Sequence, residues 1–222
     1  LGVLIIIVGI FQKTDFFKIT EIQYNKCEYM NEDSIESLLN NLNFFNDSKR
    51  VIKQRILEIP TVESVLVEKQ FPNILKLDII YKQPFLKIID NDILIITDDN
   101  GYVLAINMDI DTDYYLTGLE IAYYKINEKL ETYNQEIFNN IFVLIKLIKK
   151  SGIDIEKIIE YNDSNVCVST LAGIEVEFGD CSQIERKFND FINVYYDLVE
   201  KDVHYGVINV SITDLPLFRS TK

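Results

Sequence analysis

The sequence predicts an α+β protein of two adjoining units, each built from a sheet and two amphipathic helices. Two observations carry this prediction: apolar residues recur at helical spacing in both halves, and alternating apolar runs typical of strands lie between them. Hydrophobic residues make up 48% of the 222 residues and charged residues 26%, which is a globular balance. Because no Ser-, Pro- or Gly-rich linker interrupts the chain, the two units are expected to abut.

The first residues, Leu1–Phe11, are uncharged, and the polar residues Gln12–Asp15 follow them. This stretch has about half of the ~20 apolar residues that a membrane-spanning helix needs. We therefore expect residues 1–15 to be the outer end of a single membrane helix whose beginning lies outside this sequence. A buried first strand and the remnant of a signal peptide are the alternatives.

Residues 16–83 are expected to follow the order strand, helix, helix, strand, strand. An extended segment over 16–29 precedes a helix capped by Asn31, and a second helix begins at Asp47 or Ser48 and ends at Pro60. The apolar residues of each helix share one face: Ile35, Leu38, Leu39 and Leu42 in the first, and Ile52, Ile56 and Ile59 in the second.

Two alternating runs, residues 62–69 and 74–82, complete the first unit. The connection Gln70–Asn73 is short enough to make them an antiparallel hairpin. Three strands with one apolar face need a cover, and the two amphipathic helices supply it. The first domain is therefore expected to end near Gln83-Pro84.

Residues 84–222 are expected to form a second α+β domain on a mostly antiparallel sheet with two helices. Asn100-Gly101 between two apolar runs is a strong hairpin signal. Helical spacing marks 135–150 and a last helix that opens at the capping box Ser182–Glu185. The expected strands are 85–89, 93–97, 102–106, 158–160, 165–170, 174–178 and 207–212, after which Pro216 ends the regular structure.

Several short motifs occur in a fixed order along the chain. Pro60–Asn73 has the pattern P-x-V-x-x-V-x-V followed by an aromatic-Pro-Asn turn, and Tyr81–Phe85 is similar to an E-x-x-P junction. Ile96–Val103 is similar to an ID-x-x-G-x-V turn, and Leu116–Gly118 to an L-x-G step. Together with the last strand, Gly206–Ser211, these motifs resemble the FtsQ/DivIB family of bacterial cell-division proteins over essentially the whole chain.

The resemblance implies a POTRA domain at 16–83 and an FtsQ/DivIB-like β-domain at 84–222. It implies a non-enzymatic scaffold in the cell membrane, with most of the chain outside the cytoplasm at the division septum. FtsL and FtsB/DivIC-like proteins are the implied partners, and neither a cofactor nor a small-molecule substrate is implied. The chain departs from the family pattern at several positions: Asn25–Cys27 lacks a usual Gly, Tyr81 replaces Glu, Thr97 replaces Ile, and Asn209 and Ser211 replace Asp and Arg.

The last expected strand, 207–212, is the candidate partner site. It is rich in β-branched residues and has neither the charge nor the proline that usually blunts an edge strand. The residues alone leave open an exposed edge or an interior strand covered by 213–222, and the family resemblance favours the edge. A partner would then add a strand of its own. The candidate partner-binding residues are Val207, Ile208, Asn209, Val210, Ser211 and Ile212.

The net charge of −13 argues against nucleic acid and against anionic lipid headgroups as partners, because both attract clusters of Lys and Arg. His204 is the only histidine, and without a nucleophile pattern near it we expect a solvated loop residue. Asp109, Asp111, Asp113 and Glu120 have the spacing of a calcium loop. That loop needs Gly where Tyr114 stands, so we expect a solvated acidic loop and no metal.

Three cysteines give no disulfide framework and no zinc spacing. Cys181 is expected at the start of the last helix, where the helix dipole lowers the pKa of a thiol, and Cys27 and Cys167 are expected in strands. Two other functions stay open at this point: a POTRA module of an outer-membrane or secretion assembly, and a cell-wall-processing enzyme. The first would need further POTRA units or a barrel, and the second a catalytic cleft.

Overall fold

The structure, a computed structural model, describes residues 17–29, 32–162 and 164–221. It divides between Gln83 and Pro84 into two compact units, which are described one at a time. The expected membrane segment, 1–15, lies outside the described residues, as does the expected N-cap Asn31. Among the helices that the structure describes, none has the length and apolar content needed to cross a membrane.

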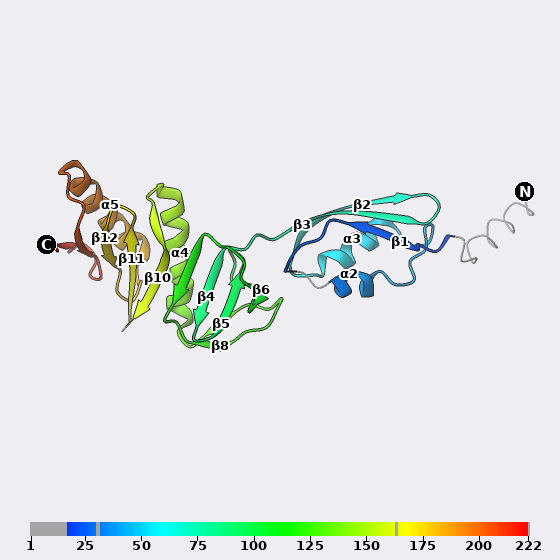
Figure 1. Cartoon of the computed structure of the whole chain (residues 1–222), viewed down its shortest axis with the longest axis horizontal. Helices are drawn as coiled ribbons and strands as arrows, with labels where there is room; N and C mark the ends of the chain where they lie inside the picture. The colour runs from blue at the N-terminus through cyan, green and yellow to red at the C-terminus, as the bar shows by residue number, and fades with distance from the viewer. Residues whose placement is uncertain (1–16, 30–31, 163, 222) are drawn as a thin grey trace, which may run out of the picture. The chain divides into compact units, whose positions relative to one another are not determined.

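The first unit is a three-stranded sheet in the order β1-β3-β2 with two helices on one face (Figure 1). Strand β2 (Val62–Gln70) pairs with β3 (Ile74–Tyr81) in an antiparallel hairpin, and β1 (Glu21–Tyr24) joins β3 in parallel. The helices are α2 (Glu32–Leu38) and α3 (Lys49–Leu57). This is the predicted strand, helix, helix, strand, strand order.

Alternation along β2 and β3 and one face of each helix build the core of the first unit. Val65, Val67, Leu75, Leu77 and Ile79 point inward from the hairpin, and Ile35, Ile52 and Ile56 meet them from the helices. The prediction for the second helix is confirmed at its start, because the Ser48 hydroxyl accepts a hydrogen bond from the backbone N–H of Val51 at 3.3 Å.

The predicted stripe of the first helix needs a correction. Helix α2 ends at Leu38, and Leu38 itself is only partly buried. Leu39 and Leu42 reach the core from the turn that follows the helix. The helical spacing of apolar residues thus extends beyond the last residue of α2. It does so because the turn after the helix also directs Leu39 and Leu42 into the core.

The second unit is built on a nine-stranded sheet in the order β14-β13-β12-β11-β10-β7-β4-β5-β6. The parallel pairs in it are β12–β13, β10–β7 and β4–β7, and the other neighbours are antiparallel, which confirms the predicted α+β class with a mostly antiparallel sheet. Its strands are β4 (Leu86–Asp90), β5 (Ile93–Thr97), β6 (Val103–Ile106), β7 (Tyr114–Thr117), β10 (Ile155–Asn162), β11 (Asn165–Thr170), β12 (Ile174–Glu177), β13 (Gly206–Asn209) and β14 (Leu217–Arg219).

Two long helices, α4 (Gln135–Ser151) and α5 (Ile184–Glu200), contact each other and pack in the same core against this sheet (Figure 1). Gly152 ends α4 in the left-handed conformation, as expected of a C-terminal glycine. A small ribbon of β8 (Ile121–Tyr123) and β9 (Glu131–Thr132) completes the unit.

The predicted capping box of the last helix is wrong. The residue before α5 is Gln183, which has a left-handed backbone and makes no side-chain cap. Ser182 instead donates its hydroxyl hydrogen to Asp180 at 2.7 Å. The Ser-x-x-Glu pattern fitted a cap, but the backbone N–H and hydroxyl of Ser182 both turn back toward Asp180.

Four strands were not predicted: β7, β8, β9 and β14. The expectation that regular structure ends at Pro216 is therefore wrong, because β14 begins at Leu217. Strand β10 is also longer than the predicted 158–160. The other strands and both helices of the second unit lie where the sequence predicts them, within a few residues at their ends.

Candidate partner-binding edge

The predicted partner strand is an interior strand. Strand β13 pairs with β12 in parallel on one side and with β14 antiparallel on the other. Its last residue is Asn209, so Val210–Ile212 leave the sheet. The prediction that 207–212 forms the sheet edge is wrong, because the chain turns back after Asp214 and lays β14 along it.

The six predicted partner-binding residues have different surroundings. Val207, Ile208 and Val210 are buried in the core. Asn209 donates its side-chain amide to the Glu177 carboxylate and accepts two hydrogen bonds from Ser211, from the N–H at 3.0 Å and from the hydroxyl at 2.6 Å. Ile212 alone of the six is largely exposed.

Strand β14 is the true edge of the sheet. It pairs with β13 in the register Val207 with Arg219, Ile208 with Phe218 and Asn209 with Leu217, and among the residues that the structure describes no further strand follows it in the sheet order. An edge strand points alternate N–H and C=O groups away from its neighbour, where another chain can pair with them. The strand is short, follows Pro216 and carries Arg219, which are features that limit unspecific pairing.

Exposed apolar side chains lie along the same C-terminal segment. Besides Leu217 and Phe218, they are Tyr205, Ile212 and Leu215. Single exposed apolar residues are ordinary, but several within one short segment beside an open edge indicate a contact surface. We call β14 and these five side chains the C-terminal edge.

A glycine lets β14 lie close to the sheet. A Cβ atom on Gly206 would come within 2.5 Å of the Phe218 ring and within 2.7 Å of the Arg219 carbonyl oxygen. The Phe218 ring therefore covers the backbone of β13 at the one position where no side chain stands. This contact, and the ladder to β13, fix the position of the edge strand.

The opposite edge of the sheet is partly covered. At the start of β6, Val103 donates its N–H to the Glu128 carbonyl at 2.9 Å and accepts the Asn127 N–H at 2.8 Å. Because these backbone groups are already paired, the start of β6 offers less to an incoming strand than β14 does.

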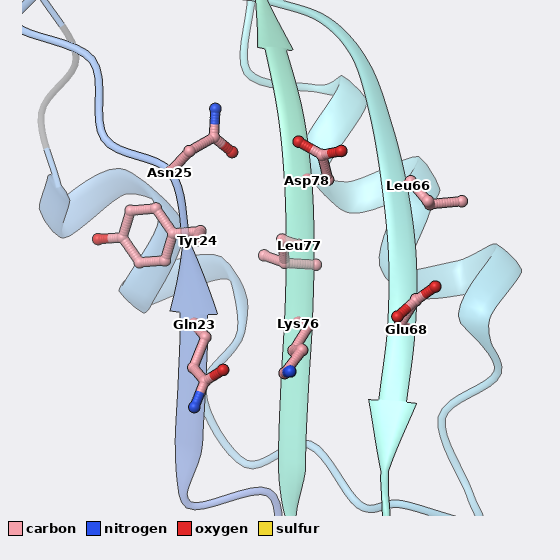
Figure 2. Close-up of a pocket in the computed structure, with 8 residues that line it drawn as sticks. All are labelled: Gln23, Tyr24, Asn25, Leu66, Glu68, Lys76, Leu77 and Asp78. Carbon is pink, nitrogen blue, oxygen red and sulfur yellow. The ribbon is translucent and has the colours of Figure 1, made fainter.

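The first unit has a shallow hollow of about 420 Å³ on its sheet (Figure 2). Lys76 stands on the middle strand, opposite Gln23 of β1 and Glu68 of β2, and Leu66 is opposite Asp78. These cross-strand neighbours of mixed charge stabilise a solvated sheet face. They do not form a convergent set of acid, base and nucleophile.

The residues considered for chemistry lie apart from one another. Asp109 contacts Lys87 at 3.0 Å, Asp113 contacts Lys149 at 3.0 Å, and Asp111 accepts the Tyr115 hydroxyl hydrogen at 3.1 Å. Within the described residues, no three His, Cys, Asp or Glu side chains are grouped to hold a metal ion.

His204 lies half-exposed between α5 and β13, 2.8 Å from Asp202, as expected of a solvated loop histidine.

The expectation for the cysteines is wrong for Cys181 and Cys27. Cys181 is fully buried, and burial raises the pKa of its thiol to about 12. Burial in the core raises the pKa by more than the nearby Lys187 ammonium lowers it. Cys167 lies in β11, as predicted, where burial raises its pKa to about 11. Cys27 lies in the loop after β1, outside any strand.

Residues 17–80 match the family described as "POTRA domain, FtsQ-type". The matched segment spans β1, α2, α3, β2 and nearly all of β3. The first unit is an FtsQ-type POTRA domain. The whole chain is similar to proteins named "Cell division protein DivIB" from Clostridium botulinum. Identity is 29% to the protein of strain Hall and 28% to that of strain Loch Maree, over 98% of this chain and 87% of each relative.

The aromatic-Pro-Asn turn at Phe71–Asn73 contacts the residues that lead into β1. Asn73 accepts the Thr20 N–H on its carbonyl at 3.1 Å and donates its side-chain amide to the Thr20 hydroxyl at 2.6 Å. The turn between β2 and β3 thus holds the entrance to β1. In the second unit, Gly118 of the L-x-G step lets two backbones approach closely, because a Cβ there would lie 1.9 Å from the Tyr161 carbonyl oxygen of β10.

Proposed function

We propose that the protein is a non-enzymatic scaffold of the bacterial cell-division machinery. Its relation to DivIB proteins supports the role in cell division, and its FtsQ-type POTRA domain supports a function in protein contacts. The uncharged residues Leu1–Phe11 support an anchor of one membrane helix, with both domains outside the cytoplasm at the septum. The proposed partners are FtsL and FtsB/DivIC-like proteins.

The observation that carries the proposal is the open edge at β14. A partner segment that adds a strand there would gain backbone hydrogen bonds along β14, and its side chains would meet the exposed apolar residues of the C-terminal edge. The proposed partner site is therefore Leu217–Arg219 with Ile212 beside it. It replaces the predicted strand 207–212, whose core residues are out of a partner's reach.

A proline scan of β14 tests this proposal. The N–H groups of Leu217 and Arg219 point to one side of the strand and that of Phe218 to the other. Proline removes a donor, so proline at an outward-facing position should abolish binding of the FtsL and FtsB/DivIC-like proteins in pull-downs while the domain stays folded. Val210 donates its N–H to Glu177 of β12, so by alternation Val207 and Asn209, with their partners Arg219 and Leu217, direct their N–H groups between β13 and β14. Phe218 is thus the outward-facing position, and proline at Leu217 or Arg219 should release β14 from β13.

Leu217→Ser is the matched control for the scan, because it keeps the N–H and removes only the apolar side chain. We expect it to weaken binding without abolishing it. The proposal is wrong if all three proline variants capture the partners as the parent chain does.

The non-enzymatic part of the proposal has a separate test. Its support is the placement of the candidate groups: the Cys181 thiol is buried, His204 faces Asp202 in a solvated loop, and the acidic side chains of 109–113 each face a different partner. Purified protein incubated with peptidoglycan should release no soluble fragments. Turnover above that of a heat-denatured sample would contradict this part of the proposal.

A further inference from the structure

Four phenylalanines form one cluster at an end of the POTRA domain. Phe17 precedes β1, Phe44 and Phe45 lie between the helices, and Phe71 is in the β2–β3 turn. The ring centroids are 4.9 Å apart for Phe17 and Phe45, 5.2 Å for Phe44 and Phe45, 5.8 Å for Phe44 and Phe71, and 6.0 Å for Phe17 and Phe71. Three separate chain segments thus bring these rings together.

Phe45 and Phe71 are the exposed rings of the cluster, and they stand on a buried Phe17 and a partly buried Phe44. The exposed fraction is 52% for Phe45 and 65% for Phe71, whereas Phe138, Phe178 and Phe191 are almost completely buried. Leaving large aromatic surface in water forgoes the free energy of burial, and such patches mark contact sites for proteins or membranes.

The cluster is held in place by its surroundings. The Lys69 ammonium lies 5.5 Å from the centroid of the Phe44 ring and donates to the backbone carbonyls of Phe44, at 2.6 Å, and of Asp47. The Phe44 N–H in turn bonds to the Phe17 carbonyl at 2.8 Å. Because the loop and the entrance to β1 are fastened in this way, the exposed rings are presented by a fixed backbone.

The position of the cluster in the sequence indicates which surface its exposed rings contact. Phe17 is six residues beyond Phe11, the end of the uncharged N-terminal run. Six residues span at most about 21 Å when fully extended. If Leu1–Phe11 is the outer end of a membrane helix, the rings lie within that distance of the bilayer. Lys18 and Lys49, both exposed, lie near the cluster and suit the headgroup region, although the whole chain is acidic.

We propose that this phenylalanine cluster rests in the bilayer interface and seats the POTRA domain on the membrane surface. Apolar side chains at such a surface are buried at the boundary between headgroups and acyl chains, with cationic side chains beside them. This inference rests on the membrane anchor of the proposed function. It adds a second, specific contact between the folded domain and the lipid.

Tryptophan fluorescence tests the contact, since the chain contains no tryptophan of its own. The whole chain carrying Phe45→Trp or Phe71→Trp is reconstituted in phosphatidylcholine vesicles with or without bromine on the acyl chains. We expect brominated lipid to lower the emission of both variants at least about twofold, because bromine quenches only an indole that reaches the acyl boundary.

Leu66→Trp is the matched control, because Leu66 is 59% exposed on β2 of the same domain but lies outside the cluster. Its emission should be the same in both kinds of vesicle. Equal quenching at all three positions, or none at Phe45 and Phe71, would overturn the inference. Flotation of the vesicles tells the two proposals apart. Protein that floats but is not quenched contradicts only the cluster contact. Protein that does not float contradicts the membrane anchor as well.

Discussion

Asn25 directly follows β1, and its side-chain amide pairs with the backbone of Ile79 in β3. Its amide donates to the Ile79 carbonyl at 2.7 Å, and its Oδ1 accepts the Ile79 N–H at 2.8 Å. The Tyr81 hydroxyl donates to the Asn25 carbonyl at 2.8 Å, and burial raises the pKa of Tyr81 to about 12. Asn25 and Tyr81, both departures from the family pattern, therefore contact each other.

Asn25→Ala should destabilise the POTRA domain by about 1–3 kcal/mol, because the Ile79 amide and carbonyl lose their partners. Hydrogen exchange read residue by residue should show faster exchange at the Ile79 N–H. Gln23→Ala is the control, since Gln23 is exposed and its side-chain amide donates to the exposed Glu21 of the same strand. Unchanged exchange at Ile79 in the Asn25 variant would show that this bond adds no stability.

Lys187 is a buried cation that ties α5 to the end of β12. Its side chain is 2% exposed, and its ammonium donates to the Phe178 carbonyl at 3.0 Å and to the Asp180 carboxylate at 2.8 Å. The hydrogen bond from Lys187 lowers the pKa of Asp180 to about 2, helped by hydrogen bonds from Ser182. The Asp180 side chain is 58% exposed, so solvent screens much of this interaction.

Asp180→Asn should therefore cost about 1–2 kcal/mol near neutral pH, measured by chemical denaturation. The folded pKa of Asp180 lies below its unfolded value, so its contribution is present above about pH 4 and is lost as the pH falls toward 2. The difference between variant and parent should shrink over that range. Asp197→Asn, which breaks an exposed pair with Lys201, should change stability by less than about 0.5 kcal/mol.

Cys181 should be inert toward thiol reagents in the folded protein. The thiolate is the reactive form, and both the high pKa and full burial suppress it. Mass spectrometry after alkylation should find Cys181 modified only when denaturant is present, with partly exposed Cys27 modified first. Rapid modification of Cys181 without denaturant would contradict the buried position.

At the scale of elements, the position of β14 depends on the absence of a side chain at Gly206. Gly206→Ala should push the Phe218 ring away, so that the amides of Leu217–Arg219 exchange faster and partner binding weakens. Gly152→Ala is the matched control: it also adds a methyl at a positive φ, but nothing lies within 4 Å. Exchange in β14 that is equally slow in both variants would contradict this account of the edge.

The elements with a repeated apolar pattern could be predicted from the sequence. The β2–β3 hairpin alternates over eight residues or more, and α4 and α5 bury one long stripe each. Strand β7 has one fully buried residue, Leu116, after an acidic stretch, and β14 has three exposed residues after a proline. Neither carries a periodic signal, because β7 is fixed by its neighbours and β14 by Gly206.

Because β14 was not predicted, the predicted partner site was wrong, whereas the predicted fold class was still correct. Val207–Asn209 was correctly predicted as a strand, but its uncharged composition suits an interior strand as well as an edge. What decides between them is the turn after Asp214, where the Arg186 guanidinium contacts Asp214 at 2.6 Å and the Asp214 N–H bonds to Asp190 at 2.9 Å. Such contacts between distant residues are invisible to local pattern analysis.

At the scale of the whole molecule, the likeness to cell-division proteins could be predicted from the order of the motifs. Each motif is short, but together they matched the FtsQ/DivIB pattern, and the comparisons support it with a POTRA match and relatives over nearly the full chain. The phenylalanine cluster was not predicted, because its rings come from three segments that only the fold brings together.

Hydrogen exchange of the whole protein, with and without an FtsB/DivIC-like partner, tests the central claim most directly. If the partner adds a strand to β14, the outward-facing amide of Phe218 gains protection, while amides of β6 and of the POTRA edge strand β2 keep their rates. Protection that appears on β2 or β6, or on no strand edge at all while the partner is bound, would contradict strand addition at β14.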